Sequence, residues 1–127
     1  MTVHAIRACV DPRVSAVSSV RSGTMRISGL AVLSTAHIVN AERDVIEALI
    51  AVARLIDGRQ TIAFHGIAVE PHSFGFFLNT GLVVEDKRPN EVSDTLWHIL
   101  NEAERQGCDW VLFDRDEPTS PDYPLFD

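Results

Sequence analysis

The sequence predicts an α+β domain with the element order βαββαβ, a two-layer sandwich in which two helices cover one face of a four-stranded sheet. Four short runs rich in β-branched and aromatic residues alternate with two segments whose apolar residues recur at helical spacing. The chain has 127 residues, enough for one domain with its own core. This order is that of the split βαβ, or ferredoxin-like, fold. The alternative is a mixed sheet with the C-terminal tail over one edge.

Residues 1–24 differ from the rest of the chain, and we expect them to be a poorly ordered or extension segment that precedes a single domain over residues 25–127. Charged residues and a proline, at positions 7 and 11–13, interrupt the apolar stretch that a secretory signal needs. A transit peptide, an extension upstream of a start at Met25, and a strand added to a sheet edge are the readings left open.

The first half of the domain contains a strand and a helix. Residues 26–34 are mostly apolar and are predicted to form a buried strand. Asn40 is a suitable N-cap, with Glu42 in the first turn, and Gly58 ends the helix. Between these two ends, apolar residues repeat at the spacing of an amphipathic helix.

The second half predicts a hairpin, a helix and a last strand. Residues 61–69 and 74–79 form the hairpin, in which alternation sends Phe74 and Phe76 to one face and Phe77 to the other. Ser93 caps a helix that ends at Gly107. The last strand covers residues 108–113, and the prolines of the tail stop it from continuing.

Charge is spread unevenly along the chain. The net charge is −7, divided as +2 over residues 1–24, −1 over residues 25–84 and −8 over residues 85–127. An acidic field repels nucleic acid and attracts basic protein surfaces or cations, although solubility alone also explains it. We therefore expect a protein partner with a basic surface and no direct nucleic-acid binding. No apolar run approaches the ~18–20 residues of a membrane span, so no membrane partner is expected.

The two cysteines, Cys9 and Cys108, have no metal-binding spacing. We expect both to be reduced thiols in a cytoplasmic protein, with Cys108 a small core residue at the start of the last strand.

Two groups of polar residues follow predicted strands. Asp114 and Asp116 come directly after the last strand and could hold a hard cation such as Mg²⁺ or Ca²⁺, unless they cap a local turn. Ser34 and His37 follow the first strand and, with Asp114, approximate a nucleophile, a base and an orienting carboxylate. No nucleophile elbow accompanies them, so the sequence favours a protein that is not an enzyme.

The acidic tail contains the residues that we expect to bind a partner. They share a position in the last fourteen residues, which combine carboxylates with aromatic side chains: Asp114, Asp116, Glu117, Asp122, Tyr123 and Phe126. The tail aromatics could instead fold back on the sheet face that carries Phe77, or present an anchor to the partner.

Three patterns together resemble a known family. They are Ser34, Thr35, His37 and Ile38, then Gly75–Phe77, then the closing run with Ala103, Gly107, Cys108, Trp110, Phe113, Asp114, Arg115, Asp116, Pro124 and Phe126. Over about residues 27–127 the chain resembles a family of short proteobacterial domains of unknown function, often carried on plasmids, prophages and integrative elements. The resemblance implies a cytoplasmic accessory protein of mobile DNA.

Two functions from different classes are compatible with these observations. The leading one is a non-enzymatic protein-binding module, for example an inhibitor of a host defence or nucleic-acid-handling protein whose DNA site the acidic surface imitates. The alternative is a small metal-dependent enzyme or ligand binder that joins Ser34, His37, Asp114 and Asp116. The predicted fold separates the first and last strands, so the distance between them distinguishes the two functions.

Overall fold

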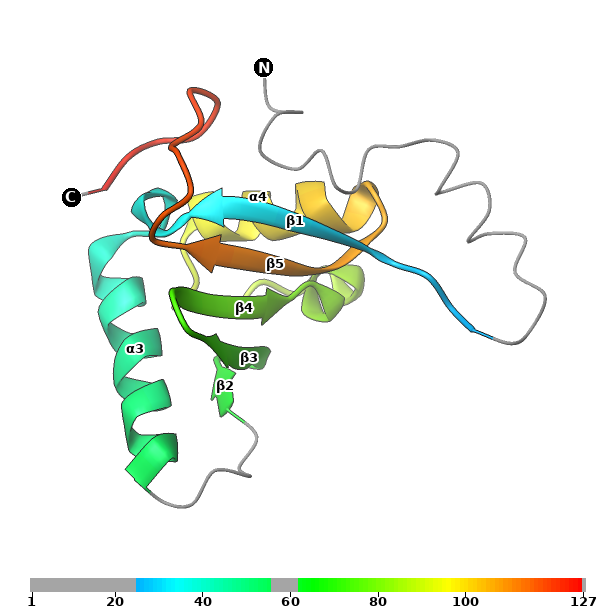
Figure 1. Ribbon diagram of the computed structural model, residues 1–127. Coiled ribbons are helices and arrows are strands. Elements are labelled where there is room, and N and C mark those ends of the chain that lie inside the picture. Colours follow the sequence, from blue (N-terminus) through cyan, green and yellow to red (C-terminus); the bar gives the residue numbers. More distant parts are fainter. Residues whose placement is uncertain (1–24, 56–61, 127) are drawn as a thin grey trace.

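The computed structural model describes residues 25–55 and 62–126 (Figure 1). The predicted segment 1–24 lies outside the described residues. The elements are, in chain order, β1 (Gly29–Ser34), η2 (Thr35–His37), α3 (Asn40–Leu55), β2 (Ile62–Phe64), β3 (Ile67–His72), β4 (Gly75–Asn79), η3 (Gly81–Glu85), α4 (Asp94–Arg105) and β5 (Cys108–Asp114). No helix in this part of the chain has the length and apolar character needed to cross a bilayer.

The strands form one mixed sheet, and the α+β class is confirmed. The sheet has five strands in the order β1-β5-β4-β3-β2, with β1 and β5 parallel and the other neighbours antiparallel. The four-stranded ferredoxin-like arrangement is therefore not the one found, because the sheet has five strands and β1 lies at its edge, parallel to β5. The element order alone does not determine which strands pair, so the sequence did not predict this arrangement.

The additional strand arises at a tight turn that the sequence analysis places inside one strand. His65 and Gly66 both have positive φ, at 48° and 87°. Two consecutive residues of this kind form the turn that suits a two-residue hairpin. The single strand over residues 61–69 is therefore wrong: β2 and β3 lie on either side of the turn, and β3 continues to His72.

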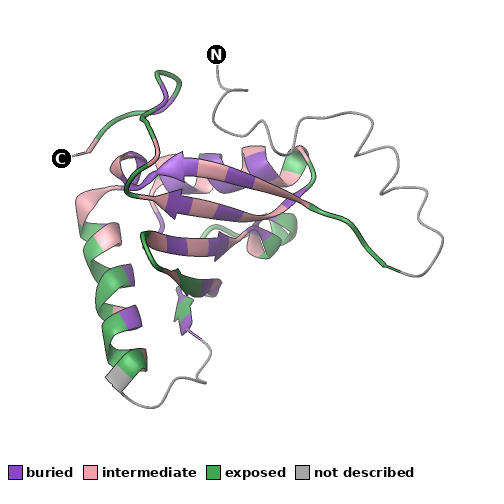
Figure 2. Cartoon of the chain, viewed as in Figure 1, coloured by how far each residue is buried: buried purple, intermediate pink, exposed green. Residues whose placement is uncertain are grey.

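The two faces of the sheet differ in what covers them. One face carries the buried side chains of the strands, which share a single core with both helices: Ala31, Leu33, Ile46, Ile50, Phe76, Leu78, Leu96, Ile99, Leu100, Val111 and Phe113. In Figure 2 buried and intermediate residues alternate along β1, β5 and β4, as one covered face requires. The other face carries half-buried side chains, among them Leu30, Phe77 and Trp110, and we call it the open face.

The start of α4 is held by a residue of α3. Ser93 is the N-cap, as predicted, and its Oγ accepts a hydrogen bond from the backbone N–H of Leu96. Glu42 is buried and accepts hydrogen bonds from the backbone N–H of Ser93 at 2.8 Å and from its hydroxyl at 2.7 Å. The two helices are thus joined by a polar contact as well as by the core.

Candidate functional site

The carboxyl ends of β1 and β5 bring two of the candidate residues together. Ser34 and Asp114 are direct partners in the parallel pairing of these strands. The expectation that the first and last strands are not neighbours is therefore wrong. Ser34, His37, Asp114 and Asp116 all lie at one end of the sheet.

Ser34 and Asp114 form local turns. The Oγ of Ser34 accepts the backbone N–H of Ala36 at 3.1 Å, and Oδ1 of Asp114 accepts the backbone N–H of Asp116 at 2.8 Å. Side chains that cap local turns are the alternative that the sequence left open to a catalytic or cation-binding role for these residues. To act as a nucleophile, the Oγ of Ser34 would have to give up the hydrogen bond that it accepts from Ala36.

His37 is fully buried, and both of its ring nitrogens are hydrogen bonded (0% exposed). The backbone N–H of Ser120 lies 2.9 Å from Nε2 and the carbonyl oxygen of Pro124 lies 2.8 Å from Nδ1. Because an amide N–H can only donate, Nε2 is the acceptor, and Nδ1 carries the proton that it donates to Pro124. In this state neither nitrogen is available as a general base or metal ligand, and His37 acts instead to hold the tail.

A cation at Asp114 and Asp116 would have two carboxylates to bind it. No group of three or more His, Cys, Asp or Glu side chains with metal-binding geometry occurs within residues 25–55 and 62–126. Ca²⁺ and Mg²⁺ take six or more oxygen ligands, so main-chain oxygens or water would have to supply the rest.

The tail packs at the end of β1 and not on the open face. Tyr123 is 6% exposed, and its ring lies 5.7 Å from that of His37 and 6.3 Å from that of His98. Burial, with smaller contributions from the charges of Glu102 and Asp122, raises the pKa of the Tyr123 phenol. The prediction that the tail could fold back over Phe77 is wrong, and Tyr123 belongs to the core.

The other tail candidates remain at the surface to different degrees. The backbone N–H of Phe126 donates to the carbonyl of Ala36 at 2.8 Å, and its side chain is half-buried. Asp116 and Asp122 are exposed, whereas Asp114 and Glu117 are intermediate. The surface of the tail is therefore acidic, and its aromatic residues are partly or fully engaged within the domain.

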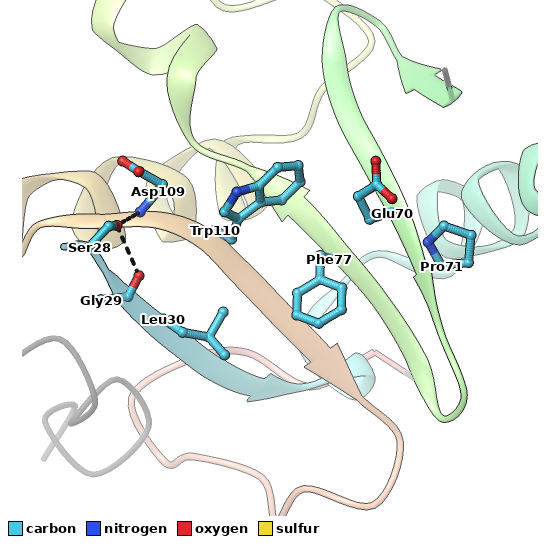
Figure 3. Close-up of a pocket in the computed structure, with 8 residues that line it drawn as sticks. All are labelled: Ser28, Gly29, Leu30, Glu70, Pro71, Phe77, Asp109 and Trp110. Carbon is cyan, nitrogen blue, oxygen red and sulfur yellow. Dashed lines mark hydrogen bonds between the residues drawn. The ribbon is translucent and has the colours of Figure 1, made fainter. Parts of the chain in front are cut away.

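A row of side chains crosses the open face. Glu70 of β3 is the direct partner of Phe77 of β4, and Leu30 of β1 is the direct partner of Trp110 of β5. The rings of Phe77 and Trp110 join these two pairs, with centroids 6.5 Å apart and nearly perpendicular planes. A groove of about 470 Å³ lies over this row, and it is lined in addition by Ser28, Gly29, Pro71 and Asp109 (Figure 3).

The two ends of the groove carry carboxylates in different states. Asp109 is bound by both terminal nitrogens of the Arg26 guanidinium, with Nη2 2.6 Å from Oδ1, and this pairing holds the pKa of Asp109 below its ordinary value. Burial acts on Asp109 in the opposite direction. Glu70, at the other end, is exposed and forms no salt bridge within the part of the chain that the structure describes. One carboxylate of the groove is thus neutralised by the chain itself and one is not.

Comparison with known proteins places the chain in a family. The model described as "Family of unknown function (DUF5983) C-terminal domain" matches residues 30–127. The chain belongs to this family. No curated protein and no solved structure matches the chain.

The DUF5983 match begins in β1 and takes in both helices, the open-face row and the tail that His37 holds. It supports the resemblance as far as a family of unknown function. In this DUF5983 domain, alternation along the sequence separated Phe77 from Phe76, but it was not used to place Trp110, Glu70 and Leu30 on the same face as Phe77. Alternation within residues 108–113 was the available signal, because it places Trp110 opposite the buried Val111 and Phe113.

The structure describes one of the two cysteines of this DUF5983 chain, Cys108. Cys108 is buried in the core, as predicted. Its sulfur is disulfide-bonded, so the expectation of a reduced thiol is wrong for Cys108. Cys9 lies outside the described residues.

Proposed function

We propose that this protein is a non-enzymatic protein-binding module whose binding surface is the open face of the sheet. The observation that carries the proposal is the row of Leu30, Trp110 and Phe77, which no described helix covers. Aromatic residues in a shallow groove with a polar rim are typical of the centre of a protein interface.

The charge of the domain selects the kind of partner. Residues 85–127 have a net charge of −8, and Asp114 and Asp116 stand at the carboxyl end of β5, beside the open face. Such a surface favours a partner with basic residues and speeds its association. It also disfavours direct contact with nucleic acid, whose phosphates it would repel.

The setting that we propose is that of an accessory protein of mobile DNA. Its partner would be a host defence or nucleic-acid-handling protein, inhibited because the acidic surface occupies the site of the nucleic acid. The family resemblance described above supports the setting, and the net charge of −7 supports the mode of inhibition.

The cytoplasm is the compartment that this setting implies. The disulfide at Cys108 argues against it, because structural disulfides are rare in reducing compartments. Alkylation of thiols in intact cells, followed by fractionation, decides the point. A reduced Cys108 in the cytoplasmic fraction supports the proposed location, and an oxidised Cys108 in an exported fraction contradicts it.

Selective capture tests the proposed function. The wild-type domain, a Trp110→Ser variant and a Val52→Ser variant are immobilised and exposed to host extract, and bound proteins are identified by mass spectrometry. Val52 is exposed on α3, so its variant controls for a general loss of apolar surface. We expect a protein that the wild type and the Val52 variant retain and the Trp110 variant loses; equal retention by all three would contradict the proposal.

Salt and charge variants test the electrostatic part separately. Asparagine can still accept the hydrogen bond that Oδ1 of Asp114 takes from Asp116, so Asp114→Asn with Asp116→Asn removes charge and keeps the turn. We expect weaker capture from this double variant, and weaker capture by the wild type in about 0.5 M salt, where screening is strong. Capture that is unchanged in both cases would rule out an electrostatic contribution.

The second candidate function is a metal-dependent enzyme or ligand binder. The pairing of Ser34 with Asp114 favours it, because that pairing brings the predicted residues to one sheet end. Calorimetric titration with Mg²⁺, Ca²⁺ and Zn²⁺ tests it. Heat of binding that is lost in the Asp114→Asn, Asp116→Asn variant supports a metal site, and the absence of heat and of a thermal shift rejects it.

A further inference from the structure

We propose that the groove on the open face receives an arginine side chain of the partner, with its guanidinium between Glu70 and the rings of Phe77 and Trp110. This inference rests on the proposed function and names the chemistry that the partner contributes. It follows from the register of β3, β4 and β5, from the side chains that this register aligns on the open face, and from the carboxylate of Glu70, which has no salt bridge among the described residues.

The register aligns an acceptor and two rings. Glu70 and Phe77 are opposite each other on antiparallel strands, so their side chains rise together from the same face. Trp110 stands on the next strand, its ring 6.5 Å from that of Phe77. In Figure 3 the two rings lie between Glu70 at one end of the groove and Asp109 at the other. Neighbouring strands are about 4.8 Å apart, so Glu70 on β3 and Phe77 on β4 are within the reach of one arginine side chain.

An arginine matches each part of this row. Its planar guanidinium stacks on aromatic rings and binds a carboxylate through two parallel N–H donors. Its methylene stem can cover the apolar surface of Phe77 and Trp110 while the charged head stays near water. A lysine offers the charge without the planar stacking surface, and a neutral side chain offers no partner for Glu70.

The chain's own Arg26 shows which end of the groove remains available. Its guanidinium binds Asp109 through both terminal nitrogens, and that pair is at least one-third exposed on both sides. The Arg26–Asp109 end is therefore locally neutral, whereas Glu70 has no salt-bridge partner among residues 25–55 and 62–126. An incoming cation gains more at Glu70 than at Asp109, which sets the direction of the arginine in the groove.

Peptide binding to a single-tryptophan variant tests the inference directly. Trp97→Phe leaves Trp110 as the one tryptophan in the chain. Its fluorescence is titrated with a blocked hexapeptide of alternating threonine and arginine, and with the same peptide carrying citrulline, the neutral analogue of arginine. We expect the arginine peptide to change the Trp110 signal saturably and the citrulline peptide to bind at least about tenfold more weakly, the loss expected of one charge-assisted contact.

Matched charge variants separate a specific site from general attraction. Glu70→Gln should reduce binding of the arginine peptide to the level of the citrulline peptide. Glu47→Gln, which removes the same charge from an exposed position on α3, should leave binding nearly unchanged. Both positions are exposed, so circular dichroism should show an intact fold in each variant.

The peptide and capture experiments distinguish failure of the arginine site from failure of the proposed function. Equal binding of the two peptides, or equal effects of the Glu70 and Glu47 variants, overturns the arginine site. If Trp110→Ser nevertheless abolishes capture of the natural partner, the open face remains the binding surface. If capture does not depend on Trp110 although the arginine peptide binds at Glu70, the arginine site stands and the proposed function fails.

Discussion

The backbone N–H of Ser120 donates to Nε2 of His37 at 2.9 Å, across 83 positions of the sequence. With the second hydrogen bond, from Nδ1 to the carbonyl of Pro124, this contact fastens the tail to the turn after β1. The tail residues 115–126 follow β5 directly, and these hydrogen bonds hold part of the tail at the end of β1. We call these two hydrogen bonds the clamp.

Replacement of His37 should therefore release the tail. His37→Phe keeps an aromatic ring in the core but leaves the N–H of Ser120 and the carbonyl of Pro124 without partners. We expect a loss of about 2–4 kcal/mol in the free energy of unfolding, measured by urea denaturation, and faster proteolysis after residue 115. His65→Asn is the control, because asparagine tolerates the positive φ at this exposed turn and should change stability by less than about 0.5 kcal/mol. Equal stabilities of the two variants would show that the clamp does not hold the tail.

The phenol of Tyr123 reports on the same region. It is the chain's single tyrosine, so its ionisation can be followed by ultraviolet absorbance without interference from another. Burial raises its pKa, and Glu102 and Asp122 add to the effect, so it should ionise above the ordinary value of about 10. Because the pKa of Tyr123 is higher in the folded state than in the unfolded state, the neutral phenol contributes to folding stability. That contribution is complete at pH values below the pKa of the unfolded state, and it is lost as the pH rises through the pKa of the folded state. An ordinary pKa in the native protein, unchanged on denaturation, would contradict the buried position of Tyr123.

The contact between Glu42 and Ser93 should couple the two helices. Both hydrogen bonds to Glu42 come from Ser93, and the Oγ of Ser93 also caps α4. We expect Glu42→Gln and Ser93→Ala each to cost about 1–3 kcal/mol, with a double variant clearly less destabilised than the sum. The free energies come from a double-mutant cycle of denaturation curves. Strict additivity would mean that the two residues act independently.

Gly75 allows β4 to approach β5 closely. A Cβ built on Gly75 would lie 1.8 Å from the carbonyl oxygen of Phe113, which is backbone and cannot turn aside. Gly75→Ala should therefore separate the strands beside Asp114 and lower the midpoint of thermal unfolding by several degrees. Gly81→Ala is the matched control, since its Cβ would meet only the side chain of Asn79. If the control lost as much stability as Gly75→Ala, the close approach would not be the cause.

Local patterns predicted much of this fold. Helical spacing located α3 and α4, and Ser93 is the N-cap of α4 that the sequence indicates, whereas Gly58, the predicted end of α3, lies outside the described residues. Alternation placed Phe76 and Phe77 on opposite faces, which the structure confirms, but Phe74, predicted to share the face of Phe76, is exposed in the turn before β4. These features depend on residues within a few positions of one another, which is why a single sequence contains them.

The features that the sequence did not predict depend on distant residues or on weak turn signals. The parallel pairing of β1 with β5 joins segments about eighty positions apart, and no local pattern states which strands are neighbours. His65 adopts a positive φ, which few residues other than glycine do, so the turn between β2 and β3 was hidden within an apolar run. The groove combines residues of four strands and could not be assembled before their order was known.

The most direct test of the central claim is the accessibility of Trp110 in the free and partner-bound protein. In the Trp97→Phe background, quenching of fluorescence by acrylamide reports on Trp110 alone among the chain's tryptophans, provided that the partner's own signal is subtracted. We expect saturation with the captured partner to reduce the quenching constant of Trp110 severalfold. An unchanged quenching constant at saturation would show that the partner binds elsewhere and that the open face is not the binding surface.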